Sequence, residues 1–253
     1  MSAYETGERP LPPPGLVLRL GRPAMLPLSS VACVRTTERV VALTYDDGPD
    51  PDHTPGILDA LAEHGARATF FVLVEAAERH PELLARILAE GHEVGLHGID
   101  HARLTTLPAR RCRELIGEGK ERLEQAIGRP VTLFRPTYGA QTLGQYRVTR
   151  SLGLDVVVWS AWARDWEGAS AEVVAERAIN SLHRGGIVLL HDASGDGVGA
   201  GTGPHDRPER TRATRMLLAG MAMRDYGSRT VGELLATFPA VRAVWAERRA
   251  RGA

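Results

Sequence analysis

The sequence lacks the marks of several protein classes. Its 253 residues include only two cysteines, Cys33 and Cys112, which do not make a disulfide framework. We expect both to be free thiols in the core. Lys and Arg together number 31, as do Asp and Glu, so the chain has no net charge and no excess of basic residues. Because nucleic-acid binding usually requires clustered basic residues, nucleic acid is not an expected partner.

Long hydrophobic runs are also missing. The longest, such as Phe70–Val74, are far shorter than the roughly 20 residues that span a bilayer, so neither a transmembrane helix nor a membrane partner is predicted. Residues 1–23 contain five prolines but no basic segment followed by an apolar one, which a secretory signal would show. We therefore expect a cytoplasmic protein, or a secreted one if a leader has been trimmed. No feature predicts the oligomeric state.

From Val40 onward, strand-length apolar runs alternate with helical patterns. Strands are predicted at residues 40–44, 68–73, 93–96, 131–134, 155–159 and 186–190. Helices are predicted between them, one through Ile57 and Leu61 up to Gly65 and others at residues 81–91, 112–128, 170–183 and 208–224. This alternation predicts βαβ units and a parallel sheet or barrel, and α/β barrels commonly use about 250 residues as one domain.

Composition suggests three segments along the chain. Residues 1–38, interrupted by Pro and Gly, are interpreted as an N-terminal arm or edge segment with a short strand at residues 16–20. Residues 39–240 form the predicted domain, and residues 241–253 a basic C-terminal tail. The glycine-rich stretch at residues 194–204 directly follows a predicted strand. It is either a flexible linker or a mobile loop over a site.

Polar residues stand where the predicted strands end. Asp46 and Asp47 follow one strand, and His97, Arg135 and His191 follow three others. In α/β barrels the carboxyl ends of the strands carry the active site. Polar residues that served only solubility would be scattered over helix surfaces, so the convergence of four strands predicts a functional site.

The spacing of two histidines suggests a metal. His97 and His101 lie four residues apart, which on a helical turn places two imidazoles on one side, although a pair of surface histidines would read the same. Either Asp46 or Asp47 would supply a third ligand and the other would act as a general base, unless Asp-Gly-Pro marks only a turn. Two His and one Asp leave an open position, as in catalytic zinc sites, and cobalt or nickel also suit these ligands.

Further candidates surround His191, which is either a core histidine or a general acid that protonates an amine leaving group. Asp165 is a candidate for orienting that imidazole. Trp162 and Trp166 offer flat surfaces to a sugar ring, whereas packing explains Trp159 better.

Taken together, five segments resemble the motifs of the polysaccharide deacetylase family, the family 4 carbohydrate esterases with a NodB-homology domain. In chain order they are residues 44–49, 97–101, 134–139, 165–166 and 189–192, and the resemblance runs from about residue 40 to residue 235. It implies a distorted (β/α)7 barrel. It also implies metal-dependent removal of N-acetyl groups from amino sugars such as chitin oligomers or peptidoglycan.

The resemblance assigns the metal and the base. Asp46 matches the family's general base, and Arg135 matches the residue that holds it. Asp47 matches the carboxylate ligand of the metal, while His97 and His101 match its two histidine ligands. Zinc is the metal expected from these ligand types.

The remaining matches surround the substrate. His191 matches the general acid, and Tyr138 matches the residue whose backbone N–H helps to form the oxyanion hole. Leu189 matches the apolar wall against the acetyl methyl group. Asp165 and Trp166 form the fourth motif.

Three positions depart from the family pattern. Gly98 stands where Ser or Thr is usual, which removes a hydroxyl near the metal. Trp162 replaces an acidic residue, which leaves Asp165 without a companion carboxylate to control the pKa of His191. Thr137 replaces a common proline. Gly98 and Trp162 also suit an alternative substrate, a small-molecule or secondary-metabolite amide in the cytoplasm. A third hypothesis is a noncatalytic carbohydrate-binding relative.

Overall fold

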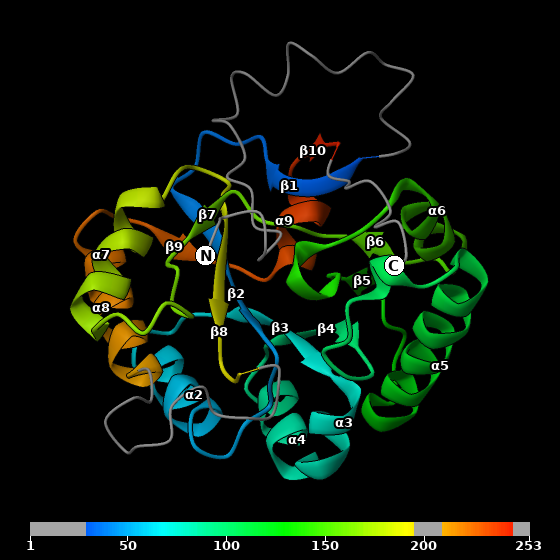
Figure 1. Cartoon of the computed structure of the whole chain (residues 1–253). Helices are drawn as coiled ribbons and strands as arrows, with labels where there is room; N and C mark the ends of the chain where they lie inside the picture. The colour runs from blue at the N-terminus through cyan, green and yellow to red at the C-terminus, as the bar shows by residue number, and fades with distance from the viewer. Residues whose placement is uncertain (1–28, 195–208, 245–253) are drawn as a thin grey trace.

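The computed structural model describes residues 29–194 and 209–244 (Figure 1). One sheet forms its centre, with the order β6-β5-β4-β3-β2-β8-β7 and with β9 beside β2, and every neighbouring pair is parallel. The strands are β2 (Val40–Asp46), β3 (Ala68–Leu73), β4 (Glu93–Gly98), β5 (Leu133–Phe134), β6 (Asp155–Val156), β7 (Ala161–Trp162), β8 (Ile187–His191) and β9 (Gly227–Ser228).

Helices cover the outside of this curved sheet, except for the short α9 (Val231–Thr237), which packs on its inner side (Figure 1). They are α2 (Thr54–Glu63), α3 (Val74–Arg79), α4 (Pro81–Ala89), α5 (Ala109–Ile127), α6 (Leu143–Ser151), α7 (Ala171–Ser181), α8 (Arg210–Ala222) and α9 (Val231–Thr237), with 3-10 turns at η2 (Leu104–Thr106) and η3 (Thr137–Gly139). Strands that alternate with helices in one domain give the distorted (β/α)7 barrel that the resemblance implies. None of the helices in the described ranges is long and apolar enough to cross a membrane.

The two faces of the sheet bury different sets of side chains. On β2, Val41 and Leu43 belong to the larger core cluster, and Val40 and Ala42 belong to a second one. Successive side chains on a strand point to opposite faces, so Asp46 lies on the face of the second cluster. The second cluster therefore fills the barrel interior, and the polar residues lie next to it at the carboxyl ends of the strands.

A two-stranded antiparallel sheet joins the ends of the described chain. β1 (Ser30–Val34) pairs with β10 (Ala240–Ala243). β1 also bridges to Val157 after β6, at one end of the main sheet, and to Gly186 before β8, the strand next to the other end. Neither strand was predicted; β1 lies in the segment interpreted as an arm, and β10 spans the predicted border at residue 240. The domain borders themselves stay predictions.

Most predicted elements are present, and the differences have physical causes. β3 has the predicted bounds, and Cys33 and Cys112 are free and buried as expected. β5 and β6 are only two residues long. Beyond β6, Val157 and Val158 donate their backbone N–H groups to Phe134 and Val31, while their carbonyls accept hydrogen bonds from Arg135 in place of a further strand.

Some expectations fall outside the described residues. They are the strand at residues 16–20, residues 195–204 of the glycine-rich stretch, and the tail from residue 245.

Candidate active site

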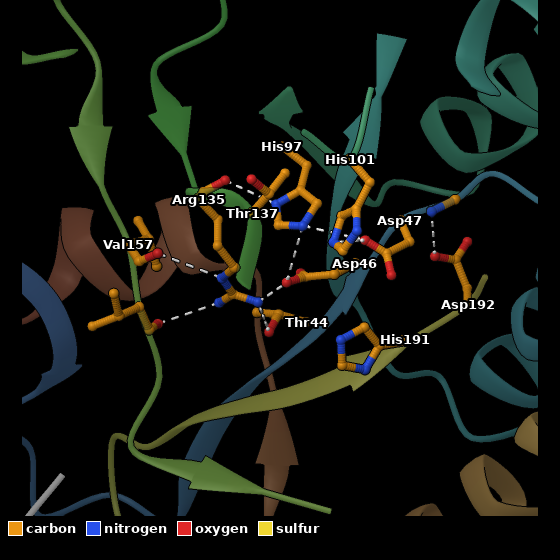
Figure 2. A network of polar contacts seen from close by, with 12 residues as sticks. Thr44, Asp46, Asp47, His97, His101, Arg135, Thr137, Val157, His191 and Asp192 are labelled. Carbon is orange, nitrogen blue, oxygen red and sulfur yellow. Dashed lines mark hydrogen bonds and ion pairs between the residues drawn. The ribbon is translucent and has the colours of Figure 1, made fainter. Parts of the chain in front are cut away.

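The predicted site residues meet at the carboxyl ends of four strands (Figure 2). Asp46 ends β2 and His191 ends β8, and the two are register partners on neighbouring strands. His97 lies on β4, and Arg135 directly follows β5. The parallel sheet thus gathers side chains from positions up to 145 residues apart in the sequence.

Asp47, His97 and His101 form a candidate metal site. Nε2 of His97 lies 3.2 Å from Oδ1 of Asp47, and Nε2 of His101 lies 3.4 Å from the same oxygen. The three potential ligand atoms all lie within 4.8 Å of one another. Asp47 has a φ of 80°, the left-handed conformation that short polar side chains tolerate, so the turn aims consecutive carboxylates in different directions.

The donor set fits a divalent cation. Nδ1 of His97 lies 2.8 Å from the carbonyl oxygen of Arg135, so Nδ1 carries the proton and Nε2 has a free lone pair. Oδ1 of Asp47 is buried and has no hydrogen-bond partner among the described residues. Burial raises the pKa of Asp47, but the neighbouring His97, His191 and His101 outweigh it and hold that pKa well below its usual range. An ionised carboxylate and two imidazoles are the ligands that zinc accepts.

The two histidines do not share a helical turn, so that part of the prediction is wrong. His97 belongs to β4, and His101 follows in a bend after Gly98 ends the strand. A Cβ atom on Gly98 would lie 2.7 Å from the carbonyl oxygen of Asp100, closer than packed atoms approach. Gly98 therefore makes room for the bend that brings His101 back toward His97, and a serine here would require the loop to move.

Arg135 anchors Asp46 from inside the barrel. Its guanidinium is fully buried, and one terminal nitrogen donates to Oδ1 of Asp46 and to Oγ1 of Thr44, both at 2.7 Å. The other nitrogens donate to the carbonyls of Val157 and Val158 at 3.4 and 3.2 Å. Asp46 is thereby fixed 3.9 Å from Nε2 of His97, next to the candidate metal site but paired with a different partner.

Aromatic packing supports the same guanidinium. The ring of Phe71 lies 4.1 Å from its central carbon. A cation over a ring face is stabilised by the negative charge of that face. Gly95 on β4 leaves space for this ring, because a Cβ atom there would lie 2.8 Å from two ring carbons.

His191 and Asp165 form the opposite side of the site. Nδ1 of His191 donates to Oδ1 of Asp165 at 2.8 Å, and the backbone N–H of His191 donates to Oδ2 at 2.7 Å. Burial lowers the pKa of His191, but the carboxylates of Asp165, Asp47 and Asp46 outweigh it and raise the pKa to about 9. His191 is therefore an acid with a proton to donate near neutral pH, even though Trp162 replaces the usual companion carboxylate.

The loop with Tyr138 lies against the candidate metal site. Tyr138 has a φ of 58°, and its ring packs 4.2 Å from the ring of His101. The hydroxyl of Thr137 donates to the carbonyl oxygen of Ala102 at 2.6 Å. The threonine that departs from the family pattern thus ties this loop to the segment that carries His101.

Three side chains predicted to form apolar contacts with the substrate lie on the interior side of the barrel. They are Leu189, Trp162 and Trp166. Leu189 is buried in the second core cluster, and Trp162 is its register partner on β7. Trp166 packs against the same cluster, and its ring meets that of His191 edge-on at 5.5 Å. This arrangement places three apolar side chains beside His191, and their contact with a substrate stays a prediction.

Comparison with known proteins decides the family. A peptidoglycan-N-acetylglucosamine deacetylase of Bacillus cereus is 33% identical over 205 residues, which make up 80% of this chain and 91% of that protein. The sequence profile of polysaccharide deacetylases matches residues 34–157. This chain belongs to the polysaccharide deacetylase family.

Other members of the polysaccharide deacetylase family agree with it in fold and in sequence. The solved structure of a peptidoglycan N-acetylglucosamine deacetylase in complex with an N-hydroxybenzamide compound has a TM-score of 0.74 and 27% identity, and covers 85% of this chain and 96% of that one. A chitooligosaccharide deacetylase of Azorhizobium caulinodans is 33% identical over 166 residues, or 65% of this chain and 79% of that protein.

Two residues that help to build this site, Thr44 and Asp192, had no role predicted from the sequence. The hydroxyl of Thr44 accepts a hydrogen bond from Arg135 and donates one to the carbonyl oxygen of Val188 at 2.6 Å. Asp192 accepts from the backbone N–H of Gly48 at 3.1 Å and from the hydroxyl of Thr54 at 2.6 Å. Thr44 and Asp192 lie inside the first and fifth motif segments, residues 44–49 and 189–192, and this position was the available signal.

Asp192 and Arg210 are both buried beside the site. Burial raises the pKa of Asp192 to about 7, although its hydrogen bond from Thr54 opposes the change. Arg210 donates to Oδ2 of Asp165 at 3.3 Å and has no sequence signal, because it opens an ordinary helix.

Replacing Arg135 tests the buried pair. Arg135→Met leaves the Asp46 carboxylate buried without its cation, so we expect the free energy of unfolding to fall by about 3–5 kcal/mol. Arg215→Met is the matched control, since it removes an exposed ion pair with Glu63 and should change stability little. Urea denaturation of the three proteins measures both effects, and equal losses in the two variants would contradict the role given to Arg135.

The variant Asp165→Asn tests the ion pair between Asp165 and His191, because the contribution of this pair to stability should depend on pH. A histidine whose pKa rises from 6.5 to about 9 on folding stabilises the fold fully below the lower value, and this stabilisation is lost as pH rises through the higher one. The stability difference between wild type and Asp165→Asn, both free of metal, should thus be largest at about pH 6 and shrink toward about pH 10. Denaturation curves across this range measure it; a difference that grows with pH would refute the pairing.

Proposed function

We propose that this chain is a zinc-dependent deacetylase that hydrolyses the N-acetyl group of N-acetylated amino sugars of the peptidoglycan or chitin type. One observation carries the proposal: the Asp47, His97 and His101 cluster lies between a carboxylate held by Arg135 and a protonated histidine held by Asp165. The family membership and the names of the relatives support this substrate class.

The cation, when bound by Asp47, His97 and His101, would polarise the acetyl carbonyl and make a water molecule more acidic. Asp46 is next to that position and accepts the proton of the attacking water, because Arg135 holds its carboxylate in place. The backbone N–H of Tyr138 is assigned to the carbonyl oxygen, where negative charge develops.

His191 completes the reaction. Its Nδ1–H is bound to Asp165, so the Nε2–H is the proton available to the departing amine nitrogen. Protonation is needed because an unprotonated amine is a poor leaving group. Leu189, Trp162 and Trp166 form the apolar side of the pocket for the acetyl methyl group and the sugar ring.

The alternative substrate is a small-molecule amide, and Trp162 is the observation that favours it. A tryptophan beside Leu189 reshapes the wall next to the acid. Cobalt or nickel in place of zinc is compatible with the same ligands.

Acetate release tests the reaction and the metal together. Protein stripped by a chelator should release no acetate from chitin oligomers, peptidoglycan fragments or N-acetylglucosamine conjugates, and added zinc should restore release. Preference for oligomers over monomers supports the polymer substrate. Zinc binding without release from any of these would contradict the sugar substrate and favour the small-molecule amide.

Two variants separate the base from the ligand. Asp46→Asn should lower kcat by about 10²–10⁴-fold, the usual contribution of a general base, and leave zinc affinity nearly unchanged. Asp47→Asn should lose zinc affinity as well as activity. Zinc titration and acetate release on both variants decide the assignment, and unchanged turnover in Asp46→Asn would refute it.

A further inference from the structure

Arg210 is buried in a place that disfavours a cation. It is the first residue of α8, and its side chain is only 5% exposed. The start of a helix carries the positive end of the helix dipole, so a cation there is repelled. Its Nε–H is also buried without a hydrogen-bond partner among the described residues. Neither feature stabilises α8, so the contacts of the Arg210 side chain must explain why an arginine is buried at this position.

Those contacts lead to the general acid. One terminal nitrogen of Arg210 lies 2.9 Å from the carbonyl oxygen of His191 and 3.3 Å from Oδ2 of Asp165. The other lies 3.4 Å from the hydroxyl of Ser194. Arg210 therefore binds both the backbone of the histidine and the carboxylate that orients its ring.

The carboxylate of Asp165 is fixed at both oxygens. Oδ1 accepts from the ring of His191, while Oδ2 accepts from the backbone N–H of His191 and from Arg210. Without Arg210, the charged donor at Oδ2 is lost, and of the described residues only His191 still donates to this carboxylate. A carboxylate held only by the residue that it orients constrains the direction of the imidazole less.

We propose that Arg210 is a positioning residue for the acid step: it holds Asp165 and the backbone of His191 so that Nε2–H of His191 points at the leaving nitrogen. This inference rests on the proposed function. It concerns only the transfer of the proton from His191 as the C–N bond breaks, and not the attack by water.

The leaving group provides the test. An N-acetyl amino sugar needs the proton of His191, whereas 4-nitrophenyl acetate expels a stable phenolate that needs none. Arg210→Met should lower kcat for the amide by about 10²-fold, at the lower end of what a general acid contributes, with KM nearly unchanged. Its kcat for the ester should fall less than about threefold. His191→Ala should show the same selectivity.

Three further proteins make the test decisive. Arg215→Met removes a guanidinium from the same helix at an exposed position, and both activities should stay at the wild-type level. Arg210→Lys keeps the charge and should show a smaller selective loss for the amide. It also carries the test if Arg210→Met does not fold. Asp46→Asn supplies the background rate of ester hydrolysis.

Each outcome has one meaning. Loss confined to the amide supports the positioning role. Equal loss for amide and ester in a folded Arg210 variant, or no loss for either, overturns it while leaving the proposed function intact. A zinc-loaded wild-type protein that hydrolyses no amide overturns the proposed function, and the role of Arg210 with it.

Discussion

Burying the guanidinium of Arg135 removes its hydration, so the surrounding chain has to supply acceptors from several strands. Thr44 and Asp46 supply them from β2, and the carbonyls of Val157 and Val158 supply them beyond β6. The carbonyl oxygen of Arg135 itself accepts from the ring of His97. One residue thus fixes the proposed base, sets the tautomer of a proposed metal ligand, and binds the two carbonyls that follow β6.

The site has two halves that join along one strand pair. β2 carries Asp46 and Asp47, and β8 carries His191 directly opposite. Asp192, the next residue, bonds to the backbone of Gly48 after the Asp46-Asp47 pair, so the turn that aims both carboxylates is tied to the strand of the acid. On one side of the site a carboxylate is paired with Arg135, and on the other side a histidine is paired with a carboxylate. That contrast is what hydrolysis of an amide by acid and base requires.

Local patterns in the sequence predict alternating strands and helices and two candidate histidine ligands, and the family resemblance selects the (β/α)7 barrel and Asp47 as the carboxylate ligand. Apolar runs mark the strands, and Asp47, His97 and His101 stand at their ends or shortly after. The sequence does not predict β1 and β10, whose pairing joins residues about 210 positions apart. It also misses Arg210, because a buried arginine at a helix start resembles an exposed one until tertiary contacts exist. The bend between His97 and His101 was mistaken for a helical turn, since the spacing alone does not show that a strand ends at Gly98.

We propose that Asp47 holds a metal while Arg135 keeps the adjacent Asp46 free for proton transfer. A crystal structure of the zinc-loaded protein, with anomalous data at the zinc edge, tests it most directly. The account predicts one zinc at about 2.0–2.2 Å from Nε2 of His97, Nε2 of His101 and a carboxylate oxygen of Asp47, with Asp46 still bonded to Arg135. Zinc bound by Asp46, or zinc away from these histidines, would contradict it.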